Sequence, residues 1–269
     1  MALAMTKGAH EPATAWEALT RELDLWTEDG RTATFWWRDD DAADHTQALE
    51  NLLDLRNTLD VPLALAVVPA HATSALRTLL LSAENFSVLQ HGYAHTNFAE
   101  YGARKIELDD SRPAAYVIGD LATGTQALES FPGFLPVLVP PWNRIAPHLI
   151  PFLPELGFRG LSTLGPRPRL SPITGVRANN VHIDIVDWRG KQTGAPVGFL
   201  GQDNILGAAC AHLEARRTGT ADADEATGLM THHAVMETES KEFVRKFVEY
   251  TKHHPAAQWL SAEKVFPAA

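Results

Sequence analysis

Short apolar runs alternate with amphipathic segments along this chain, and this alternation restricts its fold more than any other feature. The central runs, such as residues 63–68, are apolar at every position. Strands that are covered on both faces have this pattern. Strands of this kind that are separated by helices indicate an α/β protein with a parallel sheet. We therefore expect a closed or nearly closed β/α barrel, with an open doubly wound sheet as the alternative.

The pattern assigns seven strands and seven helices to one domain that spans residues 1–269. The expected strands are residues 32–37, 62–68, 87–90, 137–139, 160–163, 182–186 and 228–231. The expected helices are residues 13–26, 46–59, 74–82, 114–130, 146–156, 205–216 and 240–253. Residues 165–180 and 218–227 are rich in turn-forming or polar residues, so both are expected to be loops.

Charge and cysteine content exclude several classes of partner and site. The formal net charge of -10 argues against nucleic acid or an anionic membrane as the main partner. The single cysteine, Cys210, excludes an intrachain disulfide and a cysteine-based zinc site. The first residues lack the apolar core of a signal peptide, and no run reaches membrane-spanning length. A cytoplasmic location is therefore expected, and the oligomeric state is left open.

Polar or aromatic side chains follow five of the expected strands at their carboxyl ends. These groups are Asp39–Asp41, His91 with His95, Pro141–Asn143, Asp184 with Asp187, and His232 with His233. Taken alone, each group fits a structural role, such as a helix cap, a strand end or a solvated turn. Their shared placement favours function, because β/α barrels build their active sites from the carboxyl ends of the strands.

The aspartates and histidines are suited to hold a divalent metal ion. Three adjacent carboxylates repel one another unless a cation or a proton relieves them. His91 and His95 are four residues apart, so on the first turn of a helix they would share a face and could bind one ion. A metal held by one Asp and two His, with a second Asp beside it, can activate water.

In their order and spacing, these groups resemble the motifs of the polysaccharide deacetylase family, also called the NodB homology domain or carbohydrate esterase family four. Residues 37–41 resemble its Thr-Phe-Asp-Asp-Gly motif, and residues 91–95 resemble its His-Ser/Thr-x-x-His motif. Residues 139–142 resemble Arg-x-Pro-Tyr, residues 184–188 match Asp-x-x-Asp-Trp, and residues 229–232 resemble Leu-x-x-His. The resemblance covers residues 32–235, nearly the whole chain.

The resemblance implies a distorted (β/α)7 barrel with a zinc-type ion bound by Asp40, His91 and His95. It also implies that Asp39 is the base that deprotonates water and that His232 is the acid that protonates the leaving amine. Asp184 is counted among the catalytic residues, and Asp184 or Asp187 is expected to orient a partner side chain instead of binding the metal. The expected substrate-binding residues are Asp41, Pro141, Trp142, Asn143, Asp187 and Trp188, with a backbone N–H near Trp142 helping to hold the oxyanion.

Two departures from the family pattern affect these assignments. Val139 occupies the position of the third-motif arginine, so Arg38 or Arg144 is expected to supply its charge near Asp39 or Asp184. An additional acid, Asp41, replaces the glycine of the first motif. The register could therefore move by one residue, which would make Asp40 the base and Asp41 the metal ligand.

The sequence thus predicts a metal-dependent hydrolase of amide bonds, foremost a de-N-acetylase of a carbohydrate-like substrate. The expected cofactor is a divalent metal, zinc in the first place, and the expected partner is a small molecule or an oligosaccharide. Two alternatives stay open. One is a hydrolase of a small cyclic amide or ureide, and the other is a non-catalytic barrel that binds metal or glycan.

Overall fold

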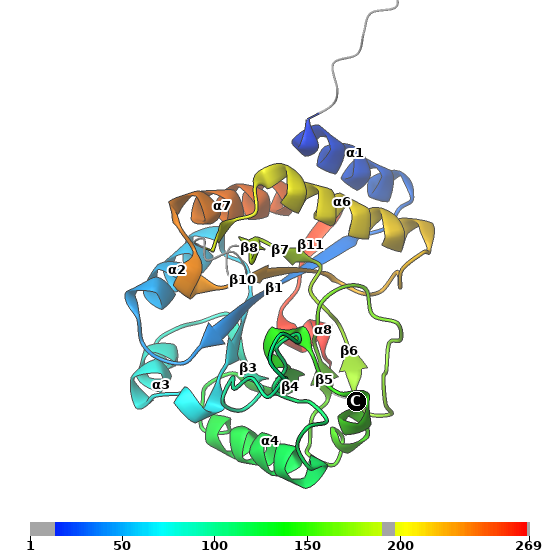
Figure 1. The fold of residues 1–269 in the computed structure, drawn as a ribbon. Coiled ribbons are helices and arrows are strands. Elements are labelled where there is room, and N and C mark those ends of the chain that lie inside the picture. Colours follow the sequence, from blue (N-terminus) through cyan, green and yellow to red (C-terminus); the bar gives the residue numbers. More distant parts are fainter. Residues whose placement is uncertain (1–13, 190–196, 268–269) are drawn as a thin grey trace, which may run out of the picture.

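A parallel β-sheet that curves into a half-barrel forms the centre of the molecule (Figure 1). The computed structural model describes residues 14–189 and 197–267. The main strands are β1 (Ala33–Ala42), β2 (Leu63–Val67), β3 (Phe86–His91), β4 (Phe134–Val139), β5 (Gly160–Leu161), β6 (Arg177–Ala178), β7 (Ile183–Asp184) and β10 (Thr227–Thr231). Their order is β6-β5-β4-β3-β2-β1-β10-β7, and each ladder on this path is parallel.

The path ends at β6 and β7, and within the described residues no ladder joins these two strands. The barrel is therefore open between them. A short strand, β11 (Ala257–Trp259), pairs with the first residues of β1, and the hairpin of β8 (Val186–Asp187) and β9 (Gly198–Phe199) lies outside the main sheet. The expected α/β class and distorted single-domain barrel are confirmed.

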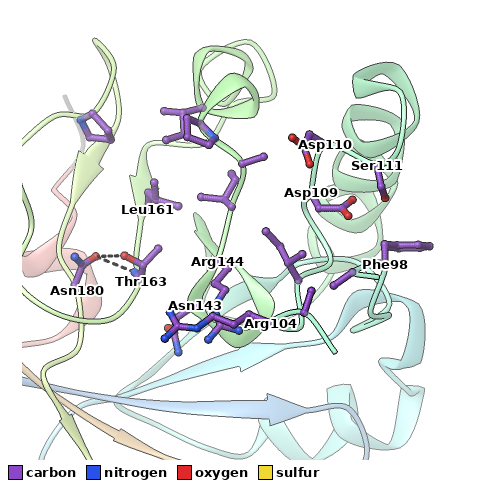
Figure 2. Close-up of a pocket in the computed structure, with 18 of the residues that line it drawn as sticks. Phe98, Arg104, Asp109, Asp110, Ser111, Asn143, Arg144, Leu161, Thr163 and Asn180 are labelled. Carbon is purple, nitrogen blue, oxygen red and sulfur yellow. Dashed lines mark hydrogen bonds between the residues drawn. The ribbon is translucent and has the colours of Figure 1, made fainter. Parts of the chain in front are cut away.

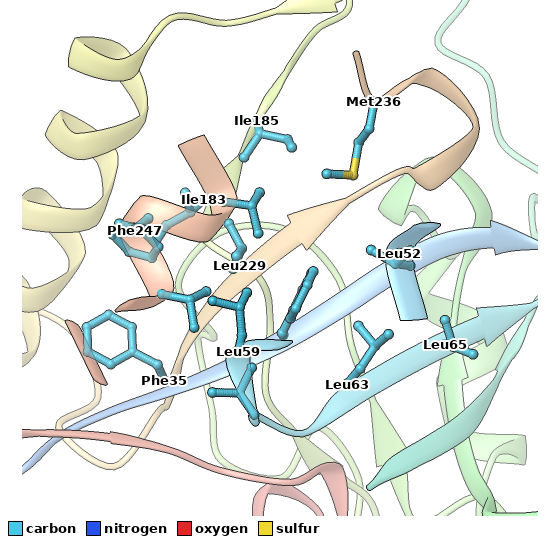
Figure 3. Packing of buried hydrophobic residues seen from close by; sticks show 14 of the residues in the cluster. Phe35, Leu52, Leu59, Leu63, Leu65, Ile183, Ile185, Leu229, Met236 and Phe247 are labelled. Atoms are coloured by element: carbon cyan, nitrogen blue, oxygen red, sulfur yellow. The ribbon is translucent and has the colours of Figure 1, made fainter. Parts of the chain in front are cut away.

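Helices surround the sheet (Figure 1). They are α1 (Ala15–Glu28), α2 (Gln47–Leu59), α3 (Ser74–Leu81), α4 (Ala114–Leu128), α6 (Gln202–Thr218), α7 (Thr238–Lys252) and the short α8 (Ala262–Val265). Side chains such as Phe35, Leu63 and Leu229 point outward from the strands and pack with Leu52 and Phe247 of the helices (Figure 3). The burial of this layer supplies the main driving force for folding.

A second apolar cluster fills the inside of the half-barrel. Trp36, Ala64 and Met230 belong to this cluster, together with Phe266 next to α8. The rings of Trp36 and Phe266 meet edge to face with their centroids 5.6 Å apart. Because alternate strand residues face opposite sides, Phe35 and Trp37 of β1 join the outer layer while Trp36 joins the interior.

Several elements differ from the expectation. The expected helix 146–156 is a 3-10 helix, η3 (Pro147–Phe152), since Pro147 and Pro151 lack the N–H that an α-helix interior needs. The expected strand 182–186 is divided between β7 and β8, and the expected loop 165–180 contains β6. Strand β1 continues through all three aspartates to Ala42 instead of ending at Trp37.

Among the described residues, the structure contains no helix with the length and apolar character that crossing a membrane would require.

Candidate active site

The carboxylates of the aspartate triplet diverge at the carboxyl end of β1. Because side chains alternate along a strand, Asp39 lies on the same outer side of β1 as Trp37, and Asp40 lies on the same inner side as Trp36. Asp41 has a φ of 73°, and the pairing of β1 with β2 is irregular between Asp39 and Ala42. This local break frees Asp41 from the strand's alternation, so the three acids reach three different environments.

Asp41, not Asp40, lies with the two histidines. Its Oδ1 is 3.1 Å from Nε2 of His91 and 3.2 Å from Nε2 of His95. One ligand atom from each of these residues lies within 4.8 Å of the others, which makes them a candidate metal-ion group. This geometry favours the alternative register, in which Asp41 and not Asp40 is the third ligand. His91 ends β3 and His95 lies in the loop behind it with a φ of 54°, so the pair does not share a helical turn as expected.

The donor set fits a zinc-type ion. Nδ1 of His91 donates a proton to the carbonyl oxygen of Val139 at 2.9 Å, so Nε2, which lies 3.1 Å from Asp41, is the nitrogen that would bind an ion once it gives up its own proton. The His91 side chain is 2% exposed, whereas those of His95 and Asp41 are 28% and 37% exposed. The cluster is thus closed on the protein side and open toward solvent, as a catalytic three-ligand zinc site requires.

Charge is concentrated around this cluster. Burial opposes ionisation of Asp41, but hydrogen bonds from His91 and His95 outweigh it and hold the pKa of Asp41 far below its usual range. Burial also opposes the charged form of His91, yet the hydrogen bond to Asp41 and the charges of Asp40 and Asp41 raise the pKa of His91. The pocket therefore favours positive charge at the position where the three donors meet.

Asp40 lies inside the barrel in a two-pronged ion pair with Arg38. The Nε and Nη2 atoms of Arg38 donate to the two carboxylate oxygens of Asp40, each at 2.8 Å. Arg38 is held in turn by Ser162 and by Oδ1 of Asn143. Burial alone would raise the pKa of Asp40, but the Arg38 guanidinium and the charges of His91 and His232 keep it below its usual value.

Arg38 therefore supplies the positive charge that was expected from either Arg38 or Arg144. Its partner is Asp40, not Asp39 or Asp184. Arg144 donates instead to the carbonyl oxygen of Lys105.

Both carboxylate oxygens of Asp39 are hydrogen-bonded to residues at the end of β10 and just after it. Its Oδ1 lies 2.6 Å from Nδ1 of His233, and its Oδ2 accepts from the His233 backbone N–H and from the Thr231 hydroxyl. Burial opposes a charge on His233, but Asp39 outweighs it and raises the pKa of His233. Since Asp39 faces the outer layer and its oxygens are engaged, the geometry gives no support to Asp39 as the base and instead makes it an anchor for the His232 segment.

His232 follows β10 at the same rim of the barrel as the metal-ion group. Its Nδ1 is buried and has no hydrogen-bond partner among the described residues. The Trp188 ring meets the imidazole edge to face with centroids 4.8 Å apart, and the Trp188 indole N–H donates to Asp184 at 2.8 Å. Burial raises the pKa of Asp184. Asp184 thus orients Trp188, which in turn packs on His232.

The loop between the two histidines is tied to a buried carboxylate that sequence reasoning missed. Glu107 accepts hydrogen bonds from the backbone N–H groups of Tyr93, Ala94 and Thr96 at 2.8–3.3 Å. Gly92 has a φ of 55°, and a Cβ there would lie 2.0 Å from Glu107 and 2.5 Å from Pro141. The tight loop therefore needs glycine at position 92. No spacing rule links Glu107 to the histidines, so its role could not be predicted from the sequence.

Backbone strain is concentrated at this rim. Six non-glycine residues in the described chain have positive φ, and four of them, Asp41, His95, Trp142 and Asn143, belong to the site. Such conformations each cost on the order of 1–3 kcal/mol and commonly accompany function. The Trp142 ring packs on His95 with centroids 4.4 Å apart, and Asn143 contacts Arg38.

Of the remaining expected substrate-binding residues, Pro141 is buried beside the histidine loop, whereas Asp187 pairs with Arg189.

A second group, His182, His212 and Glu225, also brings three possible ligand atoms together. The two imidazole rings are stacked, with centroids 3.3 Å apart and planes inclined by 13°. Because the lone pairs of nearly parallel rings do not converge, this arrangement suits neutral imidazoles beside Glu225 better than a metal ion. Burial lowers the pKa of His182 to about 4 and also lowers that of His212.

Comparison with known proteins supports the fold. No protein-family model matches the chain, and no curated protein is similar to it in sequence. A solved structure from Mycobacterium smegmatis, assigned to the polysaccharide deacetylases, aligns with a TM-score of 0.57 and 19% identity over 90% of this chain and 94% of that one.

Two further structures align with TM-scores of 0.52. The family 4 acetyl xylan esterase from Clostridium thermocellum, in complex with a cobalt ion, has 11% identity over 87% of this chain and 90% of its own. The chitin deacetylase from Colletotrichum lindemuthianum has 14% identity over 89% of each chain. The chain therefore has the fold of the carbohydrate esterase family four deacetylases, as the motif resemblance implied.

Proposed function

We propose that this protein is a metal-dependent de-N-acetylase of a carbohydrate. The proposal rests on one observation: a metal-ion donor set, a carboxylate and a histidine lie at the same rim of the barrel. Asp41, His91 and His95 form an open donor set, Arg38 fixes Asp40 beside it, and His232 lies across the rim. Structures of the same fold from three organisms bear names of carbohydrate deacetylases or esterases, and one of them is in complex with a cobalt ion.

Each step of the amide hydrolysis can be assigned to one of these side chains. A divalent ion held by Asp41, His91 and His95 would supply a water whose pKa is lowered toward roughly 7. Asp40 accepts the proton of the water that adds to the acetyl carbonyl carbon, and Arg38 keeps Asp40 ionised and oriented. As the C–N bond breaks, His232 donates a proton to the leaving nitrogen. The products are acetate and the free amine, so one water is consumed for each bond.

The remaining residues position these groups. Asp184 and Trp188 hold the imidazole of His232 from one side, and Asp39 with His233 fixes the backbone that carries it. The backbone near Trp142 is the proposed source of the oxyanion donor, held in its unusual conformation by Pro140 and Pro141. The adjoining cavity of about 1160 Å³ is larger than a small cyclic amide or ureide needs, which favours a sugar or oligosaccharide.

Acetate release from a panel of N-acetylated sugars tests the proposal. The zinc-loaded protein is expected to release acetate, the chelator-treated protein is expected not to, and added zinc should restore turnover. His91→Ala should lose metal and activity together, while His148→Ala, an exposed histidine on η3, should keep both. Metal binding without turnover on any N-acetyl sugar, cyclic amide or ureide would overturn the proposal in favour of a non-catalytic barrel.

A further inference from the structure

A large cavity opens beside the candidate active site, at the carboxyl ends of β4 and β5. It measures about 1160 Å³ and extends from Asn143 and Thr163 to the segment Phe98–Ser111 (Figure 2). Asn143 joins the cavity to the catalytic groups, because it accepts a hydrogen bond from Arg38. We take this cavity as the space for the part of the substrate that lies beyond the amide.

Three arginines, Arg104, Arg144 and Arg169, line the cavity, and none of them forms an ion pair within the part of the chain that the structure describes. Arg104 and Arg144 lie together beside Asn143 (Figure 2). Burial and the charge of Arg104 both lower the pKa of Arg144, so two guanidinium groups repel each other here without a carboxylate between them. A fourth cation, Lys105, lies 5.8 Å from the Trp142 ring.

The cavity lining has three arginines and three acids, but positive charge gathers on one side of it, at Arg104 and Arg144. Acidic side chains outnumber Lys and Arg by 33 to 23, so unpaired arginines that meet at one cavity are not a consequence of composition. The acids that line the cavity are Glu100, Asp109 and Asp110, and they form no ion pair with the arginines. Asp109 and Asp110 lie on the side away from Arg104 and Arg144 (Figure 2).

The two sides of the cavity suit two parts of one ligand. Guanidinium groups bind carboxylates and phosphates through charge-assisted, often bidentate hydrogen bonds. Carboxylates such as Asp109, whose buried Oδ1 has no partner among the described residues, accept hydrogen bonds from hydroxyl groups. An acidic sugar offers both kinds of group, with an anion for the arginines and hydroxyls for the acids.

We propose that the substrate is an acidic N-acetyl sugar whose carboxylate or phosphate binds Arg104 and Arg144 and so places the acetyl group at the Asp41–His91–His95 centre. This inference rests on the proposed function and specifies its substrate class. The anion would relieve the repulsion between the two guanidinium groups, so the cavity discriminates against neutral sugars of the same shape.

The test compares kcat/KM for pairs of N-acetyl sugars of which one member carries an anionic group and the other is neutral. N-acetylmuramic acid and its methyl ester share the ring and the N-acetyl group, and N-acetylglucosamine 6-phosphate is compared with N-acetylglucosamine. The acidic member of a pair should be preferred by about 10-fold or more, which is what one charge-assisted hydrogen bond supplies. Preference within only the first pair identifies a carboxylate, and preference within only the second pair identifies a phosphate.

Variants assign the preference to the arginines. Arg104→Gln and Arg144→Gln should lower kcat/KM for the acidic sugar about 10-fold more than for its neutral partner, mainly through KM. Arg245→Gln, an exposed arginine on α7 that pairs with Glu249, should keep the preference. Equal rates within both pairs, or a preference that survives both cavity variants, would overturn the inference while leaving deacetylation intact.

A binding measurement separates this inference from the proposed function. Calorimetric titration of the chelator-treated protein with N-acetylmuramic acid and its methyl ester needs no turnover. Tighter binding of the acid, lost in Arg144→Gln, would support the anion site even if no acetate were released. Equal binding of the acid and the ester would overturn it.

Discussion

At the scale of single residues, the site depends on how three consecutive aspartates are divided among three partners. Asp39 anchors His233, Asp40 pairs with Arg38, and Asp41 faces the histidines. The geometry favours the alternative register, with Asp40 as base and Asp41 as ligand, over the first assignment of Asp39 and Asp40. The alternation of β1 separates Asp39 from Asp40, but the positive φ of Asp41 is a tertiary constraint that no local sequence signal reveals.

Amide substitutions of the last two aspartates should have different effects. Asp41→Asn should reduce zinc binding, because the amide lacks the charge that stabilises the ion. Asp40→Asn should keep zinc and lower kcat by about 10²–10⁴, the usual contribution of a general base. Zinc content by elemental analysis and acetate release check both. If Asp40→Asn loses the metal while Asp41→Asn keeps it, the original register is right after all.

Removal of the Arg38 guanidinium should destabilise the fold and shift the pH profile. Arg38→Met leaves Asp40 buried without its partner, which should cost about 3–5 kcal/mol in the free energy of unfolding. Arg38 lowers the pKa of Asp40, so its loss should raise that pKa and move the acidic limb of kcat/KM to higher pH.

Denaturant unfolding and pH–rate profiles measure the two effects. The double variant Arg38→Met/Asp40→Asn should recover part of the stability, since no buried charge is then left unpaired. A double variant that is no more stable than Arg38→Met would contradict the role of the ion pair.

At the scale of elements, the strands and helices that were predicted correctly are those with a long apolar run or a long amphipathic segment. The strands β1 to β4 and β10 and the helices α1 to α4, α6 and α7 lie where the apolar runs and amphipathic segments placed them. The missed strands β6, β9 and β11 have only two or three residues, too few for any periodicity. A helical turn was one way in which the two histidines could share a face, but His91–His95 is a loop held by hydrogen bonds to Glu107.

Glu107→Gln should weaken metal binding without unfolding the barrel. The three backbone N–H groups of the histidine loop would lose a charged acceptor, so His95 would be held less firmly. Loss of such support typically weakens metal affinity by about 10–100-fold. Zinc titration against a competing chelator measures the effect, with Glu129→Gln, an exposed acid at the end of α4, as the matched control. Equal zinc affinity in the two variants would show that the loop holds its shape without Glu107.

At the scale of the whole molecule, catalytic groups and stabilising groups occupy different places. The metal-ion group lies at the carboxyl ends of the strands, whereas Glu225 and His182 precede β10 and β7 at the opposite ends. In barrels, the first location serves function and the second serves stability. The stacked pair of His182 and His212, the second of which belongs to α6, is therefore assigned to the stability of the folded state.

Stability should fall as the pH drops from about 6.5 to 4. In the unfolded chain His182 takes up a proton near pH 6.5, whereas in the fold its pKa is lowered to about 4. Its contribution is thus complete above pH 6.5 and is lost as the pH falls through this window, on the order of 3 kcal/mol. The raised pKa values of His91 and His233 act at higher pH, where their stabilisation is lost as the pH rises.

Denaturant unfolding of the metal-free protein at several pH values between 7 and 4 measures this dependence. His182→Gln should flatten the curve within the window. An unchanged slope in His182→Gln would rule out the buried histidines as its source.

Anomalous diffraction at the zinc edge, from crystals of the zinc-loaded protein, tests the central claim most directly. The account predicts one strong peak at the carboxyl ends of the strands, about 2.0–2.2 Å from an Asp41 oxygen and from Nε2 of His91 and His95. Asp40 should remain paired with Arg38. A peak bound by Asp40 in place of Asp41, or zinc at His182 and His212 with none at His91, would contradict the assignment of the active site.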